Sequence, residues 1–203
     1  ALEKMAVAHV KLGDLEAAVH DFTRAIEIDP DAVRPYRSRA RIHEKRGNFD
    51  EAVSDYTKAI DRAPEDQDLL ADRAEAHRLH GDTEAALRDY DRAIGAAPKR
   101  GDLLRSRGDL HRIRGEYDPA IRDYSAALEL NPQDATACWG RGEAYHGKGE
   151  SRLAAEDMNR AARIHPRYAE MLYLGTGIEA PEKTAEPAPG PDAAAAQALY
   201  HRA

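Results

Sequence analysis

Residues 81–98 read GDTEAALRDYDRAIGAAP, and the spacing of their small and large apolar residues decides the fold. Ala86, Tyr90 and Ala93 lie four and three positions apart, which places them on one face of an α-helix. The stretch begins with a glycine and ends with a proline. Glycine is favoured where a helix ends in the left-handed conformation, and proline cannot continue a helix because it lacks an amide donor. The stretch therefore predicts one amphipathic helix between two helix breakers.

The same pattern recurs every 34 residues along the chain. The recurring breakers are Gly13, Gly47, Gly81, Gly115 and Gly149, and Pro30, Pro64, Pro98, Pro132 and Pro166. A small residue, then an aromatic residue or Met, recurs in phase with them at Ala18, Ala52, Ala86, Ala120 and Ala154 and at Phe22, Tyr56, Tyr90, Tyr124 and Met158. A fixed period of this length is typical of repeat architectures. Each unit is predicted to form two helices that turn at the glycine and end before the proline.

These positions resemble the tetratricopeptide repeat (TPR) family, whose 34-residue helix-turn-helix unit carries small residues at positions 8, 20 and 27, an aromatic at 24 and proline at 32. The resemblance covers residues 1 to about 178, and position 8 holds Ala6, Ala40, Ala74, Gly108 and Gly142. Departures occur at Cys138 in position 4 and at a histidine column in position 11, His9, His43, His77 and His111. The resemblance implies an all-α fold, a right-handed superhelical solenoid of helix-turn-helix repeats.

The expected organisation is one repeat domain over residues 1–178 and a tail. The predicted units are 1–32, 33–66, 67–100, 101–134 and 135–168, followed by a capping helix at 169–178. Residues 179–191 predict an extended linker because they are rich in proline and alanine, and residues 192–203 predict a short C-terminal helix. We expect this tail to dock on the chain itself, a second copy or a larger assembly. Ala1 falls inside a predicted helix without a capping residue, so further residues are expected before it.

The composition argues against several functions. No apolar run is long enough to span a membrane. A single cysteine excludes an internal disulfide and a thiolate metal site and leaves the compartment open, with the cytoplasm as the expectation. The net charge of -7 with dispersed arginines lacks the basic footprint of nucleic-acid binding. We find no serine elbow, phosphate-binding glycine loop or His-Glu zinc motif, so neither catalysis nor a cofactor is expected.

The regular spacing of the four histidines suggests a metal site, but the distance between neighbouring units argues against one. Neighbouring units lie roughly 10 Å apart, whereas zinc ligands lie about 2 Å from the ion. We therefore expect these histidines to be half-buried between helices, each with one ring nitrogen hydrogen-bonded.

A column of arginines at position 7 predicts a ladder of ion pairs. It holds Arg39, Arg73, Arg107 and Arg141, and position 23 on the second helix holds Asp21, Asp55, Asp89, Asp123 and Asp157. An arginine in a helix seam needs a partner because a buried unpaired charge is costly. Pairing within units leaves Asp21 beside Met5 and unmatched, whereas pairing with the following unit leaves Asp157 unmatched. We favour pairing within units; the alternative is that these arginines line a ligand groove.

The resemblance implies that positions 2, 5, 9 and 12 of the first helices form a concave ligand groove. The candidate partner-binding residues at these positions are Arg34, Arg37, Arg41, Arg78, Arg105, Arg112, Trp139 and Tyr173. We expect a protein or peptide ligand with an acidic group near the arginines of the second unit and an apolar anchor at Trp139 and Tyr173, because exposed Trp and Arg dominate interface energies. The alternative is that Trp139 covers the junction with the capping helix.

Some family members hold a chaperone's C-terminal carboxylates with a clamp of Lys, Asn, Asn, Lys and Arg across three units. Counted from the first, second and third units, those positions read Glu3, Val7, Ser38, Asp68 and Asp72; Arg37, Arg41, Asp72, Asp102 and Ser106; and Ala71, Glu75, Ser106, Thr136 and Gly140. None of the three sets matches, which argues against chaperone tails as the ligand.

The predicted function is a non-catalytic scaffold or adaptor that binds a peptide or protein segment on its concave groove as part of a larger assembly. One alternative is the substrate-recruiting arm of a larger enzyme whose catalytic domain lies outside this sequence. Another is self-association, with the tail helix of one copy in the groove of the next.

Overall fold

The computed structural model describes the backbone of residues 2–176 and the side chains of residues 2–172. This part of the chain forms eleven α-helices and no strand. The first helices of the five hairpins are α1 (Leu2–Leu12), α3 (Val33–Lys45), α5 (Gln67–His80), α7 (Gly101–Ile113) and α9 (Ala135–Gly147). The second helices are α2 (Leu15–Ile28), α4 (Phe49–Arg62), α6 (Thr83–Ala96), α8 (Tyr117–Leu130) and α10 (Ser151–Ile164), and α11 (Pro166–Thr176) follows them. The predicted linker and C-terminal helix lie outside the described residues.

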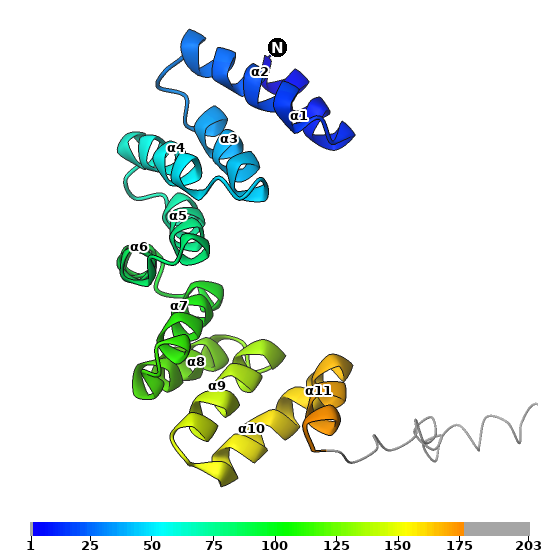
Figure 1. Cartoon of the computed structure of the whole chain (residues 1–203). Coiled ribbons are helices and arrows are strands. Elements are labelled where there is room, and N and C mark those ends of the chain that lie inside the picture. Colours follow the sequence, from blue (N-terminus) through cyan, green and yellow to red (C-terminus); the bar gives the residue numbers. More distant parts are fainter. Residues whose placement is uncertain (1, 177–203) are drawn as a thin grey trace, which may run out of the picture.

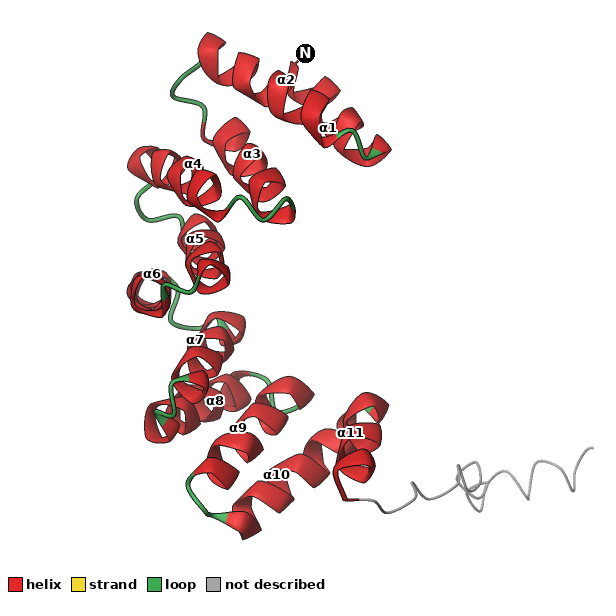
Figure 2. Ribbon diagram, viewed as in Figure 1, coloured by secondary structure: helices red, strands yellow, loops and turns green. Residues whose placement is uncertain are grey.

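The hairpins follow one another along a curved path and leave a hollow on one side (Figure 1). Helices α3 and α5 lie towards that hollow, whereas α4 and α6 lie on the outer side. Short loops join all of the helices (Figure 2). The predicted all-α solenoid of helix-turn-helix repeats is confirmed.

The predicted helix breakers, glycine and proline, lie at or near the helix ends in the structure. The five turn glycines have φ between 75° and 94°, the left-handed region that only glycine enters without strain, as at Gly81 after α5. Pro30 follows two residues after the end of α2, and the same holds for the prolines after α4, α6 and α8. Pro166 differs because it is also the first residue of α11, so this helix begins at 166 rather than at the predicted 169. Proline is favoured at that position, where its missing amide has no intrahelical acceptor.

An alanine seam joins the two helices of each hairpin. One alanine per second helix is buried along the whole stack, at Ala18, Ala52, Ala86, Ala120 and Ala154, and the first four are fully inaccessible to solvent. Small residues allow helix axes to approach at the short end of the usual range, about 8 Å. Tyr56 and Tyr124 fill the space beside the seam and are also fully buried.

The seam leaves no room for a larger side chain. Ala93 is fully buried in a cluster with Leu70 and Leu103, so Ala93→Leu should lower the free energy of unfolding by about 1 to 3 kcal/mol through overpacking. Urea denaturation followed by circular dichroism measures this change. Ala96→Leu is the matched control because Ala96 is exposed on the same helix, and its effect should stay within about 0.5 kcal/mol. Equal effects of the two substitutions would contradict the placement of the seam.

Candidate functional site

Four bidentate ion pairs join the two helices of the second to fifth hairpins. Arg39 on α3 donates from Nε and Nη2 to the two carboxylate oxygens of Asp55 on α4, both at 2.7 Å. The other three pairs have the same geometry at 2.6 to 2.9 Å and are Arg73–Asp89, Arg107–Asp123 and Arg141–Asp157. The hydrogen bonds to Asp55 raise the pKa of Arg39 above its usual value. Pairing within units is therefore confirmed, and these guanidinium groups point into the seam.

The remaining nitrogen of each of these arginines reaches the preceding hairpin. Nη1 of Arg39 donates to the Thr23 hydroxyl at 2.8 Å, and the corresponding acceptors in the later units are Thr57, Asp91 and Ser125 at 2.6 to 3.0 Å. One side chain thus connects three helices from two repeats. This second connection was not predicted, although Thr23, Thr57, Asp91 and Ser125 share the 34-residue period.

The first hairpin has no such arginine, as predicted. Met5 occupies the position and is 51% exposed. The Asp21 carboxylate is buried and has Nδ1 of His9 at 3.2 Å and Nδ1 of His20 at 3.7 Å. The first repeat is therefore held together without the clamp that the other four share.

The predicted hydrogen bond to one ring nitrogen is present in only part of the histidine column. Nδ1 of His111 lies 2.6 Å from Glu116, which agrees with the prediction of one bonded nitrogen. The prediction is wrong for His9 and His43, because Nδ1 of each is buried with no hydrogen-bond partner among the described residues. For His43, the nearby Asp55 is already engaged by Arg39. Burial lowers the pKa of both His43 and His77. Within the described residues, no group of three His, Cys, Asp or Glu side chains could hold a metal ion.

These two histidines should make the stability depend on pH. Since their pKa is lower in the folded chain than in the unfolded chain, the unfolded chain binds protons more readily, and stability falls as the pH is lowered from about 7.5 to about 5.5. His43→Gln with His77→Gln should flatten this dependence in urea titrations at several pH values. His80→Gln is the control because His80 is exposed, and a pH dependence that only this control flattened would contradict the assignment.

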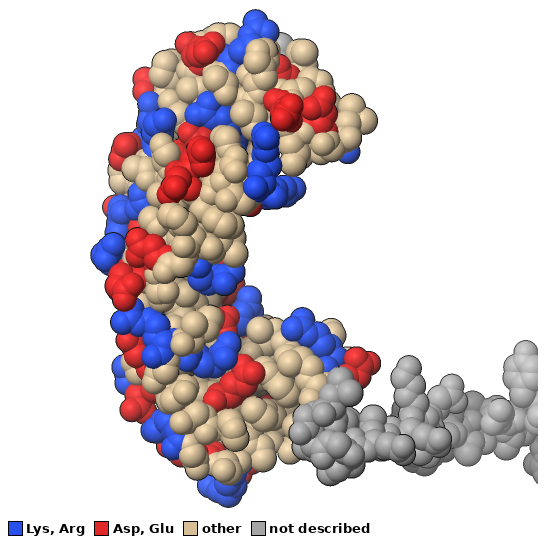
Figure 3. Space-filling view, viewed as in Figure 1, with Lys and Arg blue, Asp and Glu red and all other residues tan. Residues whose placement is uncertain are grey.

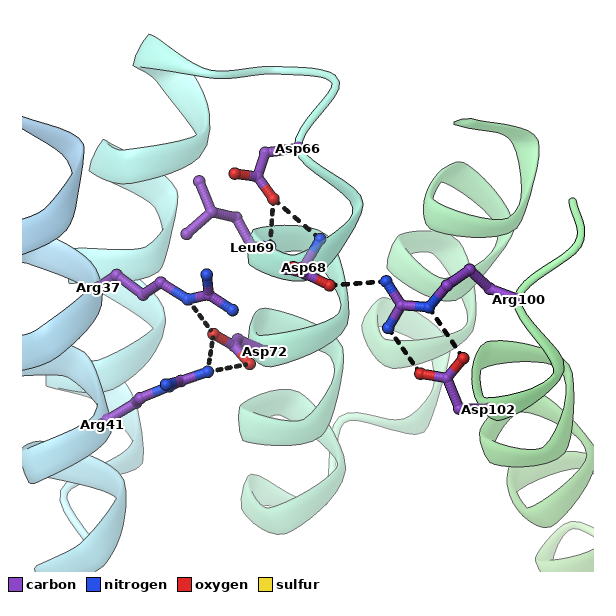
Figure 4. A network of polar contacts seen from close by, with 8 residues as sticks. All are labelled: Arg37, Arg41, Asp66, Asp68, Leu69, Asp72, Arg100 and Asp102. Atoms are coloured by element: carbon purple, nitrogen blue, oxygen red, sulfur yellow. Dashed lines mark hydrogen bonds and ion pairs between the residues drawn. The ribbon is translucent and has the colours of Figure 1, made fainter. Parts of the chain in front are cut away.

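The predicted basic cluster on α3 is only partly neutralised, by a single carboxylate. Arg37 and Arg41 both bind the Asp72 carboxylate on α5, at 2.7 Å and 3.1 Å (Figure 4). Arg34 is exposed at the start of α3 and has no carboxylate within ion-pair distance among the described residues. The three arginines therefore lie on one helix, but only Arg34 is free of a carboxylate partner.

The other predicted groove arginines are also paired. Arg78 binds Glu75 at 2.5 Å, Arg105 binds Asp134 at 2.6 Å, and Arg112 lies 3.3 Å from Glu143. Further along the groove, Arg100 connects Asp68 on α5 with Asp102 on α7 (Figure 4). Asp72 and Asp134 were not predicted as partners, because Asp72 lies one repeat beyond Arg37 and Arg41 and Asp134 lies at the far end of its unit, as the N-cap residue of α9.

Tyrosine hydroxyls from the second helices complete this polar surface. Tyr56 donates to Glu44 at 2.5 Å, and Tyr124 donates to Asp109 at 2.6 Å. Burial raises the pKa of Tyr90 to about 12, so its hydroxyl stays protonated. The middle of the groove thus carries many charges that are already paired with one another.

The predicted apolar anchor consists of Trp139, whose side chain the structure describes, and Tyr173, whose side chain it does not describe. Trp139 is half-buried and stacks on Tyr168 of α11, with ring centroids 5.2 Å apart. Its Nε1 is buried and has no hydrogen-bond partner among the described residues. This geometry fits the alternative in which Trp139 covers the junction with the capping helix. Tyr173 lies on α11, but its side chain is outside the described part of the chain.

None of the described helices combines the length and the hydropathy of a membrane-spanning segment.

Family models of the repeat match most of the solenoid. A TPR repeat model matches residues 108–149, and a tetratricopeptide repeat model matches residues 3–67 and 37–101. No curated protein matches the chain.

Several solved structures share the fold. A tetratricopeptide repeat protein from Parabacteroides merdae ATCC 43184 is 25% identical with a TM-score of 0.78, and the match covers 87% of this chain and 72% of that one. YrrB, described as a TPR protein with an unusual peptide-binding site, is 23% identical with a TM-score of 0.73 over 87% and 90% of the two chains. The MamA protein is 20% identical with a TM-score of 0.75 over 83% and 92%.

Proposed function

Because this chain belongs to the tetratricopeptide repeat family, a family of protein-interaction scaffolds, we propose that it is a non-catalytic adaptor that binds a peptide or protein segment in its concave groove, as a component of a larger assembly. The peptide-binding site described for YrrB, which has the same fold, supports this proposal.

The observation that carries the proposal is the ordered polar surface on the first helices. Arg37, Arg41 and Asp72 hold one another across α3 and α5, and Arg105 is fixed to Asp134 across α7 and the start of α9. Side chains that are already held in place lose little conformational entropy when a ligand binds. A curved row of fixed donors and acceptors therefore suits an extended polypeptide, whose backbone groups need hydrogen-bond partners.

A groove variant and a matched outer variant test the proposal. The groove variant replaces Arg34, Arg37 and Arg41 with alanine, and the control replaces the exposed second-helix residues Arg24, Arg88 and Arg122 with alanine. Peptides are first selected from a random displayed library on the full chain, and their affinities are then measured by fluorescence anisotropy.

We expect the groove variant to weaken binding of selected peptides by about 2 kcal/mol or more, roughly thirtyfold, since arginine is a frequent hot-spot residue. The outer variant should bind like the parent, and both should keep the parent's helical circular dichroism. Selection of no peptide, or equal affinities for the two variants, would refute groove binding.

A further inference from the structure

We propose that the ligand is anchored at the junction of the first two repeats, and that the ligand is an acidic segment carrying a bulky apolar side chain. This proposal rests on the proposed function and specifies both the place of the anchor and the chemistry of the partner. It differs from the expectation drawn from the sequence, which placed the apolar anchor at Trp139 and Tyr173.

The junction between α1 and α3 forms an apolar groove, which we call the first-junction groove. One cavity of about 290 Å³ has Val7, Val10, Phe22 and Ile42 among its lining residues. A second cavity of about 410 Å³ shares Val7 with it. The Val7 side chain is 46% exposed although it is apolar, so a ligand that covers it removes apolar surface from water.

The later junctions have polar groups in the same places. One repeat further on, the position of Phe22 holds Tyr56, and the positions of Val7 and Val10 hold Arg41 and Glu44. The two following repeats have Tyr90 with Glu75 and Arg78, and Tyr124 with Asp109 and Arg112.

Those polar groups are already bonded to each other, as in the pairs Tyr56–Glu44, Arg78–Glu75 and Tyr124–Asp109. An apolar side chain that entered there would separate these pairs and leave polar groups buried without partners, which is costly. Entry into the first-junction groove separates no such pair, because its floor consists of apolar side chains. The anchor is therefore favoured at the first junction.

The charge around the first-junction groove is positive, in contrast to the net charge of -7 of the whole chain. The rim includes Arg41, which shares the carboxylate of Asp72 with Arg37, and four cations with no ion pair among the described residues, Lys4, Lys11, Arg34 and Lys45. Glu3 is the one carboxylate among the described residues lining the two cavities. In the space-filling view, Lys and Arg atoms gather where α3 ends beside the hollow (Figure 3). Acidic residues on either side of the apolar anchor would complement this rim.

The test uses the full chain and a fluorescein-labelled peptide with a central Leu-Phe pair flanked by glutamates. Two control peptides replace the glutamates with lysines or the Leu-Phe pair with alanines. The rim variant is Lys11→Glu with Lys45→Glu. Its matched control is Lys58→Glu with Lys99→Glu, which makes the same charge change at exposed residues that line neither cavity. Val7→Ser tests the apolar floor at a site exposed enough for the fold to tolerate it.

We expect the acidic Leu-Phe peptide to bind the parent and both control peptides to bind at least tenfold more weakly. The rim variant should weaken binding at least tenfold, Val7→Ser about threefold or more, and the Lys58 and Lys99 control less than twofold. Circular dichroism melting verifies that all of the variants fold.

Four results would overturn the inference, and they separate it from the proposed function. If library-selected peptides bind but are basic, or if they depend on Arg105 and Arg112 and not on Lys11 and Lys45, groove binding stands and the first-junction anchor is wrong. If no peptide of any composition binds, both proposals fail. If labelled peptide binds only after residues 177–203 are removed, the chain's own tail occupies the groove and the external acidic ligand is wrong.

Discussion

The Arg73→Met variant should lose about 3 to 5 kcal/mol of unfolding free energy, because it removes the partner of a buried carboxylate. Asp89 is 4% exposed, and both of its oxygens accept hydrogen bonds from Arg73 at 2.7 Å. Methionine fills much of the same space but cannot neutralise the charge. The variant also loses the bond to Thr57, which joins the third repeat to the second. Urea denaturation at neutral pH measures the loss.

Two comparisons separate the charge from the packing. Arg73→Met combined with Asp89→Leu removes both charges and should recover most of the loss, since apolar replacement of a buried pair is often neutral or stabilising. Arg88→Met on the exposed face of α6 should change stability by no more than about 0.5 kcal/mol. A double variant as unstable as the single one would show that packing of the aliphatic stem, and not charge, sets the cost.

The repeat period made the hairpins and the ladder predictable. Ala86, Tyr90 and Ala93 define a helix face by spacing alone, and the glycine before them is a residue favoured at a helix end. Once the helices are antiparallel, positions 7 and 23 can face each other within a hairpin, which favoured the pairing of Arg73 with Asp89 over pairing with the following repeat.

The contents of the groove were less predictable because they depend on how far each repeat is rotated against the next. Arg37 and Arg41 look like a free basic cluster in the sequence, and only the stacking of α5 on α3 brings Asp72 between them. The stacking of Trp139 on Tyr168 depends in the same way on the angle of α11. Each of these contacts joins residues about one repeat apart, where no periodic rule fixes the direction of a side chain.

Tyr124→Ala should be as damaging as the loss of an arginine clamp, at about 3 to 5 kcal/mol, because it removes a fully buried ring from between two repeats. A methyl group on Gly108 of α7 would lie 3.2 Å from this ring, and one on Gly140 of α9 would lie 2.6 Å from it. The two glycines therefore shape the slot that the ring fills, and alanine at 124 leaves that slot empty. Tyr124→Phe keeps the ring and loses only the hydroxyl, which donates to Asp109 and accepts from Arg112, so it should cost about 1 to 2 kcal/mol.

The cavity that Tyr124→Ala would leave between the fourth and fifth repeats also predicts how this variant will unfold. Repeats gain stability mainly from their neighbours, so weakening one interface can uncouple the repeats on either side. Trp139 is the single tryptophan and lies on α9, just beyond the junction, so its fluorescence reports on the C-terminal repeat while circular dichroism reports on all helices. The two signals should coincide in the parent, whereas in Tyr124→Ala the fluorescence transition should come at lower urea with a smaller m-value. Coincident transitions in this variant would mean that the fourth and fifth repeats stay coupled through Arg141 and Ser125 and do not depend on the tyrosine slot.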